Sequence, residues 1–225
     1  MVREPKRLPP EPDGQLIHHR TYDVEAYRED DGRRLRLRGM VHDEKPPGIY
    51  FPDDPDPLSV HQMVVDLVLD FPTLEIVEVD VVMEVTPHAA CVSIEETYQK
   101  LVGLSIARGF SRKVKDLFGG PLGCTHIGAL LQAMAPVAIQ SMWSMQAAAA
   151  QAAKEAGETE VTFGPMDDEG RKRAMAFNLN TCHMWAEDGP NVALIRSGGE
   201  MEPPVWAVER LEALGRDPEE WSRGR

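Results

Sequence analysis

A short segment beginning at Gly123 places three side chains that could do chemistry next to one another. Cys124, Thr125 and His126 follow a glycine-rich turn, and an apolar, helix-like pattern begins immediately after them. A helix start offers unpaired backbone N–H groups and the positive end of the helix dipole. The segment could therefore supply metal ligands, a thiol nucleophile, an acid–base histidine or simply a helix cap.

Zinc is the metal to consider first, because it accepts thiolate and imidazole ligands. Cys124 and His126 together with Cys182 and His183 would provide two of each. The spacing argues against this site, since neighbouring ligands such as Cys182 and His183 can rarely both reach one ion. The sequence also has no HExxH motif, no GxGxxG after a strand and no P-loop. We predict no metal and no cofactor, and zinc stays an alternative.

Cys124 and His126 differ in the chemistry that a helix start would give them. The dipole would stabilise a Cys124 thiolate, with His126 or His183 as its base, but free cysteines are more often small buried residues. The same dipole would keep His126 neutral, so that it could accept or donate a proton near pH 7. We expect Thr125 to cap the helix, His126 to be the reactive member and Cys124 mostly to fill space.

Other candidates lie on predicted strands. Alternation places His18 and Tyr22 on one face of the first strand, and His61 on the apolar face of the third. Arg38 projects from the second strand and could hold a carboxylate or phenolate, whereas Arg34 and Arg36 fit cross-strand charge pairing better. The predicted catalytic residues are His126, His61, Arg38 and Tyr22; the predicted substrate-binding residues are His18, Thr125, Cys124 and His183.

The elements that position these residues begin with two hairpins. Residues 15–30 and 33–44 alternate around the turn at Asp30-Asp31-Gly32, and residues 59–71 and 74–85 form a second pair around Pro72-Thr73. In the last strand the expected inward row is Val77, Val79, Val81 and Met83. These patterns predict an α+β fold with an antiparallel sheet of at least four strands.

Helical patterns follow the hairpins. A capping box at Ser93–Glu96 opens a helix that should stop near Gly109, and residues 110–120 read as a connector of about one helical turn. A long helix should run from Thr125 to about Glu155, with a kink at Pro136. The sheet is expected to pack against this long kinked helix.

The C-terminal third is less clearly patterned. We expect a short helix at 167–175, a strand pair within 178–199, and an amphipathic helix that starts at Pro203-Pro204 and ends at Gly215. The predicted domains are a flexible arm at 1–13, a single α+β domain at 14–200 and a C-terminal helix at 201–225.

Composition excludes several classes of partner. The net charge of −13 argues against nucleic acid and against an anionic membrane surface. The uncharged run from Ile127 to Ala153 is rich in alanine and glutamine, which favours a buried helix or an oligomer interface over a membrane span. Three cysteines and a charged, proline-rich start favour a cytoplasmic protein. We expect a homo-oligomer.

Several stretches taken together resemble a bacterial family catalogued only as a domain of unknown function. They span roughly residues 15 to 195, and the Gly-Cys-Thr-His helix start is the most specific part: "HHR" (18–20), "GMVHDEKP" (39–46), "VHQMVVDLVLD" (60–70), "GLSIARGFSRKV" (103–114), "GGPLGCTHIGALL" (119–131) and "NTCHMW" (180–185). Similar proteins often occur beside genes for the catabolism of aromatic or steroid-like compounds. The resemblance brings no established catalytic residues.

Two classes of function follow. The first is a cofactor-independent lyase or isomerase that uses acid–base catalysis on a small aromatic or hydrophobic molecule, with loss of a fragment such as formaldehyde or CO2. The second is a non-catalytic protein that binds a small molecule or forms an oligomer through the alanine- and methionine-rich helix. A zinc-dependent hydrolase is a further alternative.

Overall fold

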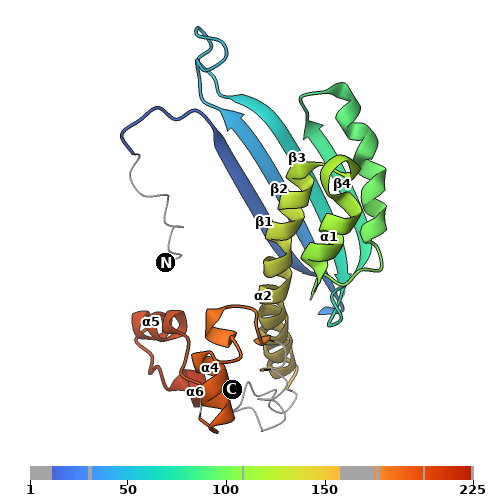
Figure 1. Cartoon of the computed structure of the whole chain (residues 1–225). Coiled ribbons are helices and arrows are strands. Elements are labelled where there is room, and N and C mark those ends of the chain that lie inside the picture. The colour runs from blue at the N-terminus through green and yellow to red at the C-terminus, as the bar shows by residue number, and fades with distance from the viewer. Residues whose placement is uncertain are drawn as a thin grey trace. The chain divides into compact units, whose positions relative to one another are not determined.

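The structure is a computed structural model that describes residues 12–29, 32–107, 109–157, 175, 178–199 and 201–223. The chain divides into two compact units, Met1–Gln146 and Ala147–Arg225, and the boundary between them falls inside the longest helix (Figure 1). The predicted division into an arm, one domain and a C-terminal helix stays a prediction.

The first unit is built on a four-stranded antiparallel sheet. The strands are β1 (His19–Glu29), β2 (Arg34–Lys45), β3 (Leu58–Asp70) and β4 (Glu75–Val85), and they lie side by side in the order of the chain (Figure 1). Each neighbouring pair is a hairpin. The predicted α+β fold with its antiparallel sheet is confirmed.

Helices cover one face of this sheet. They are η2 (Ala89–Leu101), α1 (Phe110–Phe118), the short η3 (Gly120–Leu122) and α2 (Thr125–Glu155). Apolar side chains from η2, α1 and α2 share one core with those of β2, β3 and β4. The buried residues of α2 recur every three or four positions, as expected for a helix that presents one stripe to a sheet: Ile127, Leu130, Leu131, Met134, Ala138, Ser141 and Met145.

A glycine on β2 sets how closely α2 approaches the sheet. A Cβ at Gly39 would lie 2.8 Å from the sulfur of Met134 and 3.1 Å from Leu130 Cδ1. The side chains of α2 therefore pack directly on the β2 backbone at this point. The start of α2 consequently lies over the same sheet face as the inward residues of β2 and β3.

The other face of the sheet carries cross-strand ion pairs. Arg34 pairs with Glu78 at 2.8 Å, Arg36 with Glu29 at 2.7 Å, and Arg38 with Asp66 at 3.0 Å. This confirms the charge pairing predicted for Arg34 and Arg36.

Three predictions about the helices are wrong. The predicted capping box does not cap, because η2 begins at Ala89 and Ser93 lies inside it, where its hydroxyl donates to the Ala90 carbonyl. Gly109 does not end this helix; with φ at 83° it precedes α1. The predicted connector is α1 itself, nine residues long, because its apolar residues Phe110, Val114 and Phe118 pack into the core.

The second unit is helical where it is described. Its elements are η4 (His183–Trp185), α4 (Pro190–Arg196), α5 (Val205–Ala213) and α6 (Glu220–Arg223). The predicted strand pair within 178–199 is wrong, since Pro190 opens a helix at a position that tolerates proline well. The predicted helix at 167–175 lies outside the described residues except for its last position. The predicted C-terminal helix is confirmed as α5, and Gly215 follows it with φ at 68°.

A membrane span is not found among the described residues: none of their helices combines the length and the apolar character needed to cross a bilayer.

Candidate functional site

Asp43 is a buried carboxylate at the end of β2. It lies on the covered face in line with Leu35, Leu37 and Val41, and its side chain is 1% exposed. The register places Arg20 of β1 directly opposite Asp43. The guanidinium donates a hydrogen bond to each carboxylate oxygen, from Nε to Oδ1 at 2.5 Å and from Nη2 to Oδ2 at 2.6 Å. Such a bidentate pair is the strongest form of charged hydrogen bond between side chains.

This pairing fixes the charge of Asp43. The hydrogen bonds from Arg20 hold the pKa of the Asp43 carboxyl well below its usual range, and they outweigh burial, which acts in the opposite direction. The Arg20 pKa is raised by the same contact. Asp43 is therefore an ionised carboxylate at every physiological pH.

Three histidines surround the same carboxylate. His61 Nδ1 lies 3.1 Å and His126 Nε2 3.2 Å from Asp43 Oδ2, whereas His18 Nε2 lies 3.4 Å from Oδ1. The rings of His61 and His126 are stacked with centroids 4.0 Å apart. We call Asp43, Arg20, His18, His61 and His126 the Asp43 cluster.

The sheet and the first turn of α2 bring these groups together. His61 is the cross-strand partner of Asp43, and the register between β2 and β3 shifts immediately beyond this pair, because Glu44 opposes Ser59. Such bulges often lie beside functional sites, where they redirect a side chain. His126 reaches the carboxylate from the second residue of α2.

The charge of Asp43 decides which nitrogens face it as donors. An ionised carboxylate can only accept hydrogen bonds, and Arg20 already donates one to each of its oxygens. Nδ1 of His61 and Nε2 of His126 both face Oδ2, so these two nitrogens are the donors. In a neutral His126 ring the second nitrogen, Nδ1, is then an unprotonated base.

His126 is held in its neutral form. Burial lowers its pKa below the ordinary value for histidine, and nearby His61 and Arg20 lower it further, although Asp43 opposes them. The neutral state agrees with the expectation from the sequence, but burial rather than the helix dipole is its main cause. A neutral imidazole beside an ionised carboxylate is the usual arrangement of a general base.

Cys124, rather than Thr125, occupies the cap position of α2. Its carbonyl accepts the first helical hydrogen bond, from the Gly128 N–H at 2.9 Å. Its own N–H donates to the hydroxyl of Tyr98 at 2.8 Å, and burial raises the pKa of this tyrosine to about 12. The predicted capping role of Thr125 is therefore wrong by one residue, and Thr125 is exposed in the first turn.

The glycines before the helix serve packing. A Cβ at Gly123 would lie 2.4 Å from the Phe118 carbonyl oxygen, and one at Gly119 would lie 2.4 Å from the Lys115 carbonyl oxygen. These contacts are far shorter than any real Cβ makes, so only glycine fits. Gly123 thus lets the start of α2 approach the end of α1, and Gly119 lets the chain leave the last turn of α1.

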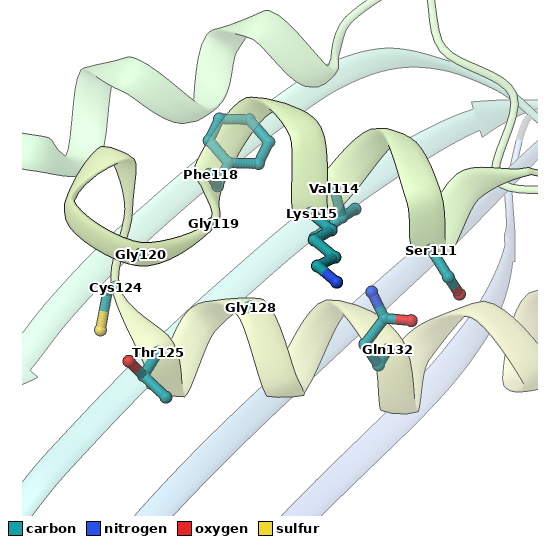
Figure 2. A pocket seen from close by; sticks show the side chains of 10 residues that line it. All are labelled: Ser111, Val114, Lys115, Phe118, Gly119, Gly120, Cys124, Thr125, Gly128 and Gln132. Carbon is teal, nitrogen blue, oxygen red and sulfur yellow. The ribbon is translucent and has the colours of Figure 1, made fainter.

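A hollow of about 430 Å³ lies between α1 and the start of α2 (Figure 2). Its wall is mainly apolar, and Lys115 and Gln132 extend toward one another across it from the two helices. The lining residues are Ser111, Val114, Lys115, Phe118, Gly119, Gly120, Cys124, Thr125, Gly128 and Gln132. No residue of the Asp43 cluster is among them, but the sulfur of Cys124 lies 3.7 Å from His126 Nδ1.

The structure gathers some of the predicted site residues and separates others. His126, His61 and His18 meet at Asp43, and the hydroxyl of Tyr22 lies at the rim, 3.4 Å from Arg20 Nη1. Cys124 and Thr125 line the hollow.

Two predicted site residues lie elsewhere. Arg38 is not part of the cluster, because alternation along β2 turns it to the opposite face of the sheet, where Asp66 holds it. His183 is an exposed residue of η4 in the second unit.

The sequence prediction missed Asp43, the residue at the centre of the site. The sequence does contain a signal for it. Asp43 continues the alternating row of Leu35, Leu37, Gly39 and Val41, so strand alternation places its carboxylate on the apolar face of the sheet. A buried carboxylate requires a partner, and Arg20 on the neighbouring strand was the available cation.

A metal ion is the other possible occupant of this cluster. One ligand atom each from Asp43, His61 and His126 lies within 4.8 Å of the others. The two ring planes are inclined by 29°, and Nδ1 of His61 and Nε2 of His126 both face the same oxygen of Asp43, at 3.1 and 3.2 Å. In this structure the two imidazoles therefore contact the carboxylate itself, and zinc stays the alternative occupant.

The fold and site thus define a class: an α+β domain in which a buried carboxylate and stacked histidines meet at the start of a helix. The family described as "Protein of unknown function (DUF2889)" matches residues 18–140. This is more than half of the chain, and the chain belongs to that family. The matched range includes the whole Asp43 cluster and Cys124. No curated protein and no solved structure matches the chain.

Proposed function

We propose that this protein is a cofactor-independent lyase or isomerase that moves protons on a small aromatic or hydrophobic molecule. One observation carries the proposal: an ionised, buried carboxylate contacts two stacked imidazoles, one of which is held neutral. Groups with displaced pKa values that converge in one place are typical of acid–base catalysis.

Each residue of the cluster has a defined role in this proposal. His126 accepts or returns a proton at Nδ1, and His61 is the second imidazole that takes part in the proton transfer. Asp43 orients both rings and stabilises the imidazolium that forms when a proton arrives, as the carboxylate does in serine hydrolases. Arg20 keeps Asp43 ionised, because it holds both of its oxygens.

The hollow favours a flat, apolar substrate. Its lining includes Cys124 and Thr125, which precede His126 in the chain, but none of the five residues of the Asp43 cluster. Val114 and Phe118 contribute to its wall, and the Lys115 ammonium could bind an acidic group on the same molecule. A proton taken from a carbon next to an aromatic ring or carbonyl leaves an electron pair on the substrate. That pair can move a double bond, as in an isomerase, or expel a small fragment, as in a lyase.

Hydrogen exchange tests the proposal without knowledge of the complete reaction. The protein is incubated in D2O with a panel of small aromatic ketones and phenols that carry acidic C–H groups, and proton NMR follows deuterium incorporation. We expect catalysed exchange by the wild type and a loss of about a hundredfold or more in the His126→Gln variant. Arg38→Gln, on the opposite face of the sheet, should exchange at the wild-type rate. Equal exchange by wild type and His126→Gln would refute the proposal.

A zinc-dependent hydrolase is the second candidate, and the proximity of the three ligand atoms favours it. Metal analysis of the same protein, before and after treatment with a chelator, separates the two. The acid–base proposal expects exchange to survive chelation. Stoichiometric zinc, together with exchange that the chelator abolishes and zinc restores, would favour the hydrolase.

A further inference from the structure

We propose that Cys124, His126 and Asp43 form a nucleophile–base–carboxylate chain that transfers acyl groups from small apolar esters through a thioester on Cys124. This activity goes beyond the proposed proton transfer and uses a residue that the proton transfer does not require. The sequence prediction assigned Cys124 to packing. The structure instead places its sulfur 3.7 Å from Nδ1 of His126, and Cys124 is also one of the residues that line the hollow.

The geometry of His126 carries this proposal. The Cys124 sulfur lies 3.7 Å from Nδ1, and Asp43 Oδ2 lies 3.2 Å from Nε2. One nitrogen of the ring thus faces a nucleophile and the other faces a buried carboxylate. Nucleophilic sites on unrelated folds share this arrangement, in which the base is itself oriented by a third group.

The carboxylate sets the tautomer that the reaction needs. Asp43 is an acceptor because Arg20 keeps it ionised, so the His126 proton lies on Nε2. The lone pair on Nδ1 therefore points toward the thiol and can take its proton. The opposite tautomer would leave the sulfur beside an N–H group and could not activate it.

The position of Cys124 gives the thiol access to a substrate. Cys124 is half-buried and is one of the residues that line the hollow. We place the acyl group at this end of the hollow, within reach of the sulfur. The Tyr98 hydroxyl holds the Cys124 backbone N–H, which fixes the start of α2. The first N–H groups of a helix lack partners within it and can stabilise the oxyanion of a tetrahedral intermediate.

The chemistry balances with an ester and water as the only reactants. The thiol proton moves to His126 Nδ1 as the sulfur attacks the ester carbonyl, and a C–S bond forms. The C–O bond to the leaving alcohol breaks, and this alcohol takes the proton from His126. Water, deprotonated by the same nitrogen, then attacks the thioester; the C–S bond breaks, the acid leaves and the thiol regains its proton.

The chain contains two thiols that serve as internal references. Cys91 is half-buried and Cys182 is exposed. If accessibility alone governed reactivity, Cys182 would react fastest. Faster reaction of the less exposed Cys124 would therefore report activation by its surroundings.

The experiment uses the full-length protein and two probes, iodoacetamide and p-nitrophenyl acetate. Peptide mass spectrometry measures the modification rate of each cysteine separately. We expect Cys124 to react about tenfold or more faster than Cys182 with both probes, in keeping with general-base assistance. His126→Gln should remove this advantage and leave the Cys182 rate unchanged. The acetyl group on Cys124 should be lost with time as acetate forms.

Three results would overturn the proposal: a Cys124 rate at or below that of Cys182, a Cys124 rate that His126→Gln does not change, or an acetyl group that stays on Cys124 without turnover. Arg38→Gln is the control for substitution in general, because it lies on the opposite face of the sheet. Thiol labelling needs no substrate of the proton-transfer reaction. Its failure is thus distinguishable from failure of the deuterium exchange.

Discussion

Replacing Asp43 with asparagine is expected to slow deuterium exchange by about a hundredfold or more, with the fold retained. The carboxylate accepts hydrogen bonds from Nδ1 of His61 and Nε2 of His126. An asparagine amide can present N–H groups to the same nitrogens, which favours the opposite tautomers and removes the bases. The charge that stabilises an imidazolium is also lost.

The same substitution should cost stability. Arg20 loses its ionised partner, and the loss of a charged hydrogen-bond partner costs about 1–3 kcal/mol; because the Arg20 side chain is 33% exposed, water compensates in part and we expect the lower end. Urea unfolding measures this. Asp66→Asn is the matched control, since Asp66 pairs with Arg38 on the open face. Exchange by Asp43→Asn at the rate of Asp66→Asn would contradict the assigned role.

Two glycine substitutions should change stability in opposite directions. Gly123→Ala should destabilise the protein by about 1–3 kcal/mol, as overpacked sites do, because the new Cβ would meet the Phe118 carbonyl oxygen at 2.4 Å. Gly128→Ala should stabilise it by about 0.5–1 kcal/mol, because Gly128 is inside α2 and its Cβ would meet nothing within 4 Å. Each substitution adds one methyl group, and the two positions are five residues apart in the chain.

Urea unfolding of the two variants is the measurement. Gly123→Ala should also slow the modification of Cys124, because a shift of the helix start moves the sulfur away from His126. A Gly123→Ala variant as stable as Gly128→Ala would show that α1 and α2 do not pack as closely as the structure has them.

The sequence predicted the sheet well because alternation is a local signal. Buried and more exposed residues alternate along β2 from Arg34 to Asp43 and along β3 from Gln62 to Leu67, so the sequence pattern identifies the residues that face the core there. The prediction failed at a bulge: the register shifts between Val68 and Leu69, so Ile76 rather than Val77 is buried on β4. A bulge depends on pairing with another strand, which one strand's pattern does not contain.

The candidate site could be predicted only in part, because some of it depends on pairing between strands. Histidine is a common catalytic residue type, so His61 and His126 are candidates from the sequence alone, and their rings do stack. Asp43 is recognisable as a site residue only when its position on the buried face and its pairing with Arg20 on β1 are known. The strand pair expected within 178–199 failed because short polar segments carry little periodicity, and helix-starting proline at 190 was the stronger signal.

The central claim is that His126 is a neutral base oriented by an ionised Asp43. Nitrogen-15 NMR of the imidazole rings, recorded as a function of pH, tests it directly. The account predicts that His126 carries its proton on Nε2 and titrates below the ordinary histidine pKa of about 6.5, because burial lowers its pKa. As pH falls, the ring should stay neutral where an exposed histidine is already charged. A His126 that is an imidazolium at neutral pH, or that carries its proton on Nδ1, would contradict the account.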